Sequence, residues 1–187
     1  AFPIFKLYGI IVSQEQLGTL TEQIQLVKSE YWGEKKIILH SRNIRKCEKG
    51  FEILFDLAVK QRFYEDINKI LGQKIYTIIC CSILKEPYIE RYGKTNDVYG
   101  QSLSFIMERT VFYLDSLGIP DNHLNVIIEQ RGKTERTTFY RYYNQLIDRG
   151  TYYVCPQRIK NYFKSLEIHW NSEDVLGLSL ASLIVYH

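Results

Sequence analysis

Short apolar segments typical of β-strands alternate along this chain with longer segments whose apolar residues recur every three or four positions. The strand-like segments are rich in Ile, Val, Phe and Tyr, and they occupy residues 2–12, 74–84, 123–129 and 166–170. The helical segments occupy residues 14–32, 51–71, 97–117, 134–149 and 173–186. Strands alternating with helices predict an α/β protein, with a layered mixed sheet flanked by helices.

The segment from Lys74 to Leu84 is apolar at most positions, which predicts a central strand covered by helices on both faces. Cys80 and Cys81 are adjacent within it, so their side chains should point to opposite faces, both in the core. The chain has four cysteines and no C-x-x-C pair. A disulfide framework or zinc site is therefore not expected, and a reducing cytoplasm suits the chain best.

No repeat or Pro/Gly/Ser-rich linker interrupts the 187 residues, so we expect one domain over residues 1–187. No apolar run is long enough to cross a membrane, and the first residues lack the features of a secretory signal. We therefore expect no membrane partner. The net charge of +3 does not by itself argue for nucleic-acid binding.

Several segments resemble, in order, the domain of unknown function 3800 family, which is grouped with RNase H-like folds. The matching pieces are the strand Phe5 to Val12, Leu39-His40-Ser41, Ile83-Leu84-Lys85, Tyr99 with Phe105 to Arg109, Ile128 to Lys133, and Gly177 to Leu183. The resemblance covers nearly the whole chain. It implies an RNase H-like domain related to nucleases in which carboxylates hold two Mg²⁺ or Mn²⁺ ions.

The chain departs from this family where acids are expected. No Asp-Glu-Ser-Gly motif precedes Phe5, and Ser179 and Ser182 stand where the family's last helix has Gln and Asp. Either the acidic pattern has decayed or the polypeptide is incomplete. A serine hydroxyl carries no charge to offset a cation, so we expect weak or no nuclease activity in the chain as given.

Three residues are the candidates for catalysis that the resemblance implies. Glu129 ends a strand and is the best candidate for a metal ligand; the alternative is an ion pair with Arg131 or a nearby Lys. Glu108, beside Arg109, is either catalytic, part of a solvated helix face, or the anchor of a structural salt bridge. His40 is either a site residue or a turn histidine bonded to backbone.

Five basic residues are candidates for contacts with nucleic acid: Lys85, Arg131, Lys133, Arg136 and Arg141. Lys85 lies at a predicted strand end, where α/β sheets bind ligands. The other four are interleaved with tyrosines, a combination that suits single-stranded nucleic acid. The alternative is a solvated helix whose charges are balanced by nearby glutamates. A non-catalytic module that binds nucleic acid or protein, or that self-associates, is the second hypothesis, and the resemblance implies a phage or defence context for it.

Overall fold

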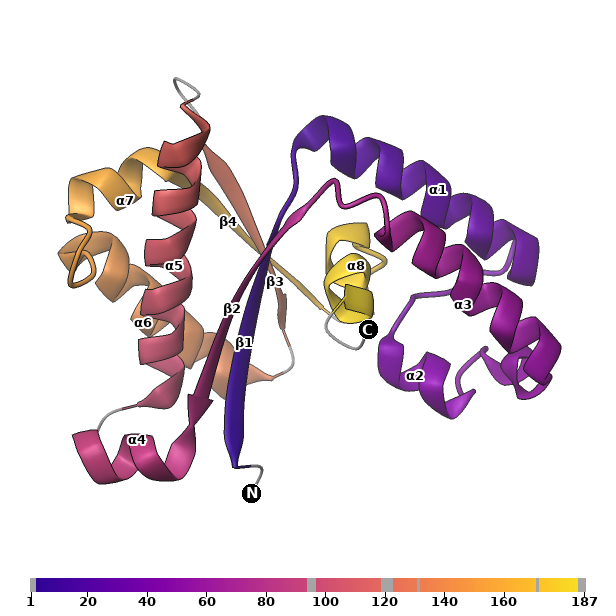
Figure 1. Ribbon diagram of the computed structural model, residues 1–187, viewed down its shortest axis with the longest axis horizontal. Coiled ribbons are helices and arrows are strands. Elements are labelled where there is room, and N and C mark those ends of the chain that lie inside the picture. Colours follow the sequence, from indigo (N-terminus) through magenta and orange to yellow (C-terminus); the bar gives the residue numbers. More distant parts are fainter. Residues whose placement is uncertain (1–2, 94–96, 119–122, 131, 171, 185–187) are drawn as a thin grey trace. The chain divides into compact units, whose positions relative to one another are not determined.

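The computed structural model describes residues 3–93, 97–118, 123–130, 132–170 and 172–184, and it is a mixed α/β structure (Figure 1). Its elements are β1 (Ile4–Ile11), α1 (Gln14–Trp32), α2 (Ser41–Lys46), η1 (Glu52–Phe55), α3 (Leu57–Leu71), β2 (Thr77–Leu84), α4 (Lys85–Tyr92), α5 (Val98–Leu117), β3 (Leu124–Gln130), α6 (Lys133–Arg149), α7 (Pro156–Tyr162), β4 (Phe163–Trp170) and α8 (Leu176–Ile184). The prediction of a chain that mixes helices and strands is confirmed, whereas the single layered sheet flanked by helices stays a prediction.

The chain divides into two compact units, and each is assembled from separate stretches of sequence. The first unit comprises Ala1–Gly9 and Ile78–Asn171, and the second comprises Ile10–Thr77 and Ser172–His187. This division does not test whether residues 1–187 fold as one domain, and that expectation stays a prediction. Among the described residues, none of the helices has the length and apolar content that crossing a membrane demands.

The described strands pair as two small sheets. β1 and β2 run antiparallel in Figure 1, and the backbone N–H of Lys85, just after β2, donates to the carbonyl of Pro3, just before β1 (2.9 Å). β3 and β4 are parallel, with Ile127 opposite Glu167. Parallel strands need a crossover connection, and α6 and α7 supply it here.

The expectation that residues 74–84 form a strand buried on both faces is wrong. Along β2 the exposure alternates, with Cys81 and Ile83 buried while Ile78 and Leu84 are 45% and 57% exposed. Cys80 is exposed, although Cys80 and Cys81 do point to opposite faces. Apolar content alone predicted two covered faces, but this two-stranded sheet buries only one.

Side-chain caps set several helix boundaries. Ser13 Oγ accepts a hydrogen bond from the N–H of Gln16 (3.2 Å), as the capping pattern predicts. The expected continuous helix over 51–71 is wrong, because Asp56 Oδ1 accepts from the N–H groups of Ala58 and Val59 and begins α3 there. The preceding residues form only the short 3₁₀ helix η1.

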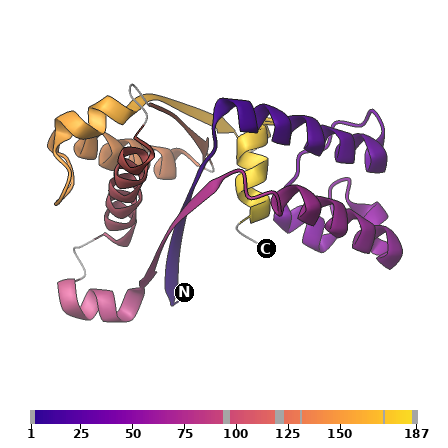
Figure 2. The ribbon, with the colours of Figure 1, turned by 45° about the horizontal axis from the view of Figure 1, so that its top comes forward.

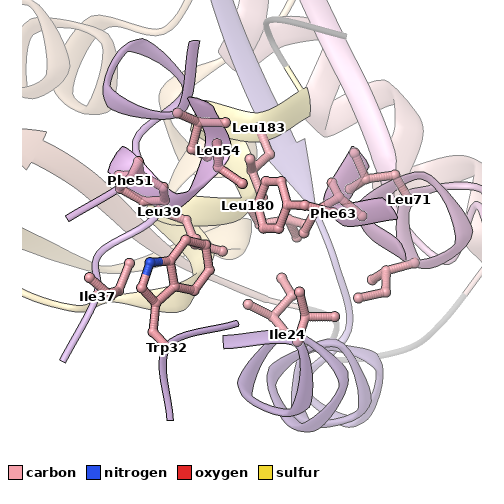
Figure 3. Close-up of a cluster of buried hydrophobic side chains, with 14 of the residues drawn as sticks. Ile24, Trp32, Ile37, Leu39, Phe51, Leu54, Phe63, Leu71, Leu180 and Leu183 are labelled. Carbon is pink, nitrogen blue, oxygen red and sulfur yellow. The ribbon is translucent and has the colours of Figure 1, made fainter. Parts of the chain in front are cut away.

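The core of the second unit is built around Trp32 and two phenylalanines (Figure 3). The Trp32 ring meets Phe51 and Phe63 edge to face, with ring centroids 5.1 and 5.5 Å apart, and its indole N–H donates to the carbonyl of Gly50 (2.7 Å). Leu180 and Leu183 of α8 join this cluster, so the C-terminal helix packs with residues far away in sequence. Within this unit α1 and α3 lie side by side (Figure 2).

The core of the first unit lies between α5, α6 and α7 and the apolar face of β3 and β4. Met107 and Val111 of α5, Phe139 of α6 and Ile159 of α7 are buried there. Ile128 and Leu166 pack against this cluster from β3 and β4. Because side chains alternate along a strand, their neighbours in sequence point to the opposite face of the sheet.

Tyr31 predicts a loss of stability at alkaline pH. Burial, followed by its hydrogen bond to Asp66 (2.8 Å), raises the pKa of Tyr31 to about 12. A folded pKa above the unfolded value of about 10 means that this stabilisation is complete below about pH 10 and is lost as pH rises towards 12. Urea unfolding at increasing pH should show a fall in stability that is smaller in Tyr31→Phe than in the wild type; equal falls would contradict this account.

Candidate functional site

One face of the β3–β4 pair contains Glu129 and other polar side chains, together with Ile127. Register aligns Asn125 with Ser165 and Glu129 with His169, and Ser165 Oγ is 2.7 Å from Asn125 Oδ1. Glu167 lies between the two positions on β4, and its Oε2 is 3.2 Å from His169 Nε2. The face therefore brings together two glutamates and a histidine from strands about forty residues apart.

Sequence reasoning found only Glu129 on this face. Glu167 and His169 follow from the parallel register, which a single sequence does not specify. An imidazole beside carboxyl groups can hold or pass a proton near neutral pH. Within the described ranges, no group of three or more His, Cys, Asp or Glu side chains is arranged to hold a metal ion.

Glu108 is buried, with 2% of its surface exposed, so its interpretation as part of a solvated helix face is wrong. Its Oε2 accepts hydrogen bonds from Thr151 Oγ1 (2.7 Å) and from the N–H of Tyr153 (3.4 Å). These contacts attach α5 to the loop between α6 and α7. They favour a structural anchor, although the anchor is a hydroxyl and a backbone N–H rather than a salt bridge; a catalytic role stays a prediction.

His40 and Ser182 both lie in the second unit. His40 precedes Ser41 in the sequence, and Ser182 contacts Ser41 from α8. His40 occupies the N-cap position of α2 without a side-chain capping bond. Instead Ser182 Oγ of α8 accepts from the N–H of Ser41 (3.2 Å) and lies 3.1 Å from its hydroxyl. A first-turn N–H group has no partner within its own helix. Ser182 therefore caps α2 from another helix.

The residues at these positions do not fit a two-metal centre. Such a centre takes several carboxylates, because their negative charge offsets that of the cations. Ser182 offers a neutral oxygen that is already hydrogen-bonded to Ser41. On β3 and β4, Glu167 Oε2 contacts His169, and the described residues hold no group of three or more metal-ligating side chains.

The predicted basic residues lie in the first unit, and three of them share α6. Lys133, Arg136 and Arg141 are exposed. The guanidinium of Arg136 lies 5.6 Å from the Tyr140 ring centroid, and that of Arg141 lies 4.6 Å from the Tyr142 ring centroid. Stacked in this way, the guanidinium groups are partly ordered while still reaching solvent.

The two remaining residues that were predicted to contact nucleic acid are Lys85 and Arg131. Lys85 is the first residue of α4 rather than the last of a strand, and it is half-buried. It directly follows Leu84, the last residue of β2, so it does lie at the end of a strand, and its contact with nucleic acid stays a prediction. Arg131 lies outside the described residues.

Sequence reasoning missed the loop that joins α6 to α7. Tyr152 and Tyr153 project from it with 89% and 67% of their surfaces exposed, while Val154 beside them is 1% exposed. Neither periodicity nor a motif marks this contrast. The only signal in the sequence is an aromatic pair between Gly150 and Pro156, the two residues that bound the loop.

A hollow of about 350 Å³ opens between β2 and α5. Its lining includes Cys80, Ser82, Phe105 and Arg109. The Cys80 Sγ lies 3.7 Å from Ser82 Oγ. The hollow combines an apolar wall with one guanidinium, and none of the predicted site residues lines it.

Comparison with known proteins places this chain beside one relative of undefined activity. It is 28% identical over 157 residues to the uncharacterized protein y4pM of Sinorhizobium fredii (strain NBRC 101917 / NGR234), a match that covers 79% of this chain and 54% of that protein. The chain thus spans about half the length of this curated relative. No family model matches the chain, and no solved structure matches it.

We predict that Glu108→Ala destabilises the first unit by about 2–3 kcal/mol, because it leaves the Thr151 hydroxyl and the Tyr153 N–H without their buried acceptor. Urea unfolding would measure the loss. The exposed Glu90→Ala is the matched control and should change stability by less than about 0.5 kcal/mol. Equal stability of Glu108→Ala and the control would refute the anchoring role.

Ser182→Ala should destabilise the second unit by about 1 kcal/mol, because the first N–H of α2 loses its acceptor. Ser182→Asp should retain most of that stability, since a carboxylate also accepts from a helix N-terminus. Ser29→Ala, on the exposed surface of α1, is the control. Unfolding that is unchanged in Ser182→Ala would contradict the capping role.

Proposed function

We propose that this chain is an RNase H-like domain related to the domain of unknown function 3800 family, and that it binds nucleic acid with weak or no metal-dependent cleavage. The ordered sequence matches and the alternation of strands and helices support the relationship. The main observation that supports weak or absent cleavage is the environment of Ser182. This serine stands at the family's acidic position, and its hydroxyl caps α2.

The chemistry at Ser182 argues against an efficient two-metal reaction. Phosphoryl transfer by that route needs two cations held close together, and each cation adds positive charge that the protein must offset. A hydroxyl adds no negative charge, and Glu129 alone cannot replace a set of three or four carboxylates. Mg²⁺ or Mn²⁺ would therefore bind weakly at the family's site in this chain.

Charge distribution supports binding of nucleic acid by the first unit. Residues 133–164 contain seven Lys or Arg and only two Asp or Glu, although the net charge of the whole chain is only +3. Three of these cations are the exposed Lys133, Arg136 and Arg141 of α6. A local excess of cations on a protein of low net charge can attract the phosphate backbone and release its counterions.

A nuclease assay tests the first part of the proposal. The purified chain with Mg²⁺ or Mn²⁺ should cleave single- or double-stranded nucleic acid no faster than its Glu129→Gln variant does. Titration with Mn²⁺, followed by calorimetry, should show no stoichiometric site that depends on Glu129. Robust cleavage or tight Mn²⁺ binding that Glu129→Gln abolishes would overturn it.

Salt dependence of binding tests the second part. The affinity for single-stranded oligonucleotides should fall steeply with salt, and Arg141→Gln should reduce the slope of log K against log salt by about 0.7, as expected for one lost phosphate contact. Lys36→Gln, an equal charge change on an exposed residue of the second unit, is the control. Absence of binding at low salt, or equal effects of the two variants, would refute the α6 surface.

A further inference from the structure

We propose that the loop between α6 and α7 is a stacking platform on which Tyr152 and Tyr153 bind unpaired bases of single-stranded nucleic acid. This inference rests on the proposed nucleic-acid binding and names the residues that would contact bases. Tyr152 and Tyr153 are among the most exposed large side chains of the described chain. Their rings meet edge to face, with centroids 4.7 Å apart, which leaves ring faces open to solvent.

Hydrogen bonds and one buried side chain fix the conformation of the loop. Glu108 Oε2 accepts from Thr151 Oγ1 and from the N–H of Tyr153. The N–H of Thr151 donates to the carbonyl of Val154 (2.8 Å), and the N–H of Val154 donates to Thr151 Oγ1 (3.0 Å). The buried Val154 side chain attaches the same turn to the core.

Gly150 permits this turn at the end of α6. Its φ is +79°, and a Cβ there would lie 2.4 Å from the carbonyl oxygen of Val154. A side chain at this position would therefore both strain the backbone and collide with the loop. With the backbone ordered in advance, a base that stacks on either tyrosine incurs little further loss of backbone entropy.

The helix that follows the loop is also fixed. Arg158 of α7 forms an ion pair with Asp115 of α5, and the Tyr162 hydroxyl donates to the other oxygen of the same carboxyl group (2.6 Å). Arg109 and Arg158 both lie over the Phe112 ring, at 5.6 and 5.7 Å from its centroid. These contacts hold α7 on α5, so the loop spans two anchored ends.

Charge around the loop selects an anionic occupant. The exposed Arg149 immediately precedes it, and Lys133, Arg136 and Arg141 are exposed on the same helix, α6. Both cations of α7 are paired, Lys160 with Asp148 (3.5 Å) and Arg158 with Asp115, so the excess of positive charge comes from α6. Aromatic faces beside an excess of cations match the two recognition elements of single strands, stacking for bases and ion pairs for phosphates.

The test compares binding of fluorescein-labelled oligothymidylate by Tyr152→Ala, Tyr153→Ala and the wild type, with oligouridylate and duplex DNA as further ligands. We expect each alanine variant to bind single strands about tenfold more weakly. Tyr152→Phe and Tyr153→Phe should bind like the wild type, because phenylalanine retains the stacking surface. Duplex DNA should be insensitive to all four substitutions, since its bases are already stacked.

Controls separate this inference from the proposed function and from misfolding. Thermal unfolding of Tyr152→Ala should match the wild type, because the side chain is 89% exposed. If the wild type binds single strands and both alanine variants bind equally well, the stacking platform is wrong while nucleic-acid binding stands. If the wild type binds no single strand at low salt, both proposals fail. A wild-type dimer in sedimentation that Tyr152→Ala dissociates would assign the loop to self-association and overturn the platform.

Discussion

The burial of one carboxyl group, that of Glu108, is the constraint on which much of the first unit depends. A buried carboxyl group is costly unless its oxygens accept hydrogen bonds, so the chain must bring donors to it. Those donors come from Thr151 and Tyr153, more than forty residues away. Satisfying Glu108 therefore determines the path of the α6–α7 loop, and this path places two tyrosines in solvent while Val154 enters the core.

The second unit meets the same requirement at two places, one neutral and one charged. The N-terminus of α2 needs an acceptor, and Ser182 of α8 provides it through Ser41. The buried Lys28 of α1 pairs with Asp174, ahead of α8, at 2.6 Å. Both contacts bring the C-terminal segment to residues about 140 positions earlier, where Leu180 and Leu183 also complete the aromatic core. Polar contacts and apolar packing thus hold the C-terminal segment in this unit together.

The sequence predicted features that depend on nearby residues better than features that depend on contacts between distant segments. The strands at β3 and β4 and the helices at α1, α5 and α6 were predictable, because periodicity and caps such as Ser13 act within a few residues. The short helices α2, α4 and α7 were missed, since six to eight residues contain too little periodicity. Among candidate site residues, the sequence suggested Glu129 and the cations of α6, whose roles stay predictions, whereas Glu167 and His169, the neighbours of Glu129, depended on strand register.

By itself the sequence determined the α/β class, the main helices, the excess of cations in residues 133–164 and the serine at position 182, because these are properties of composition and local spacing. Only the tertiary structure decided that β2 buries one face, that Glu108 is an anchor inside the protein, and that Ser182 caps a distant helix. The physical reason is that burial and hydrogen-bond partners are set by segments far apart in the chain. Periodicity indicates which side of an element is apolar, but the elements packed against that side decide which polar groups lose water and must find partners.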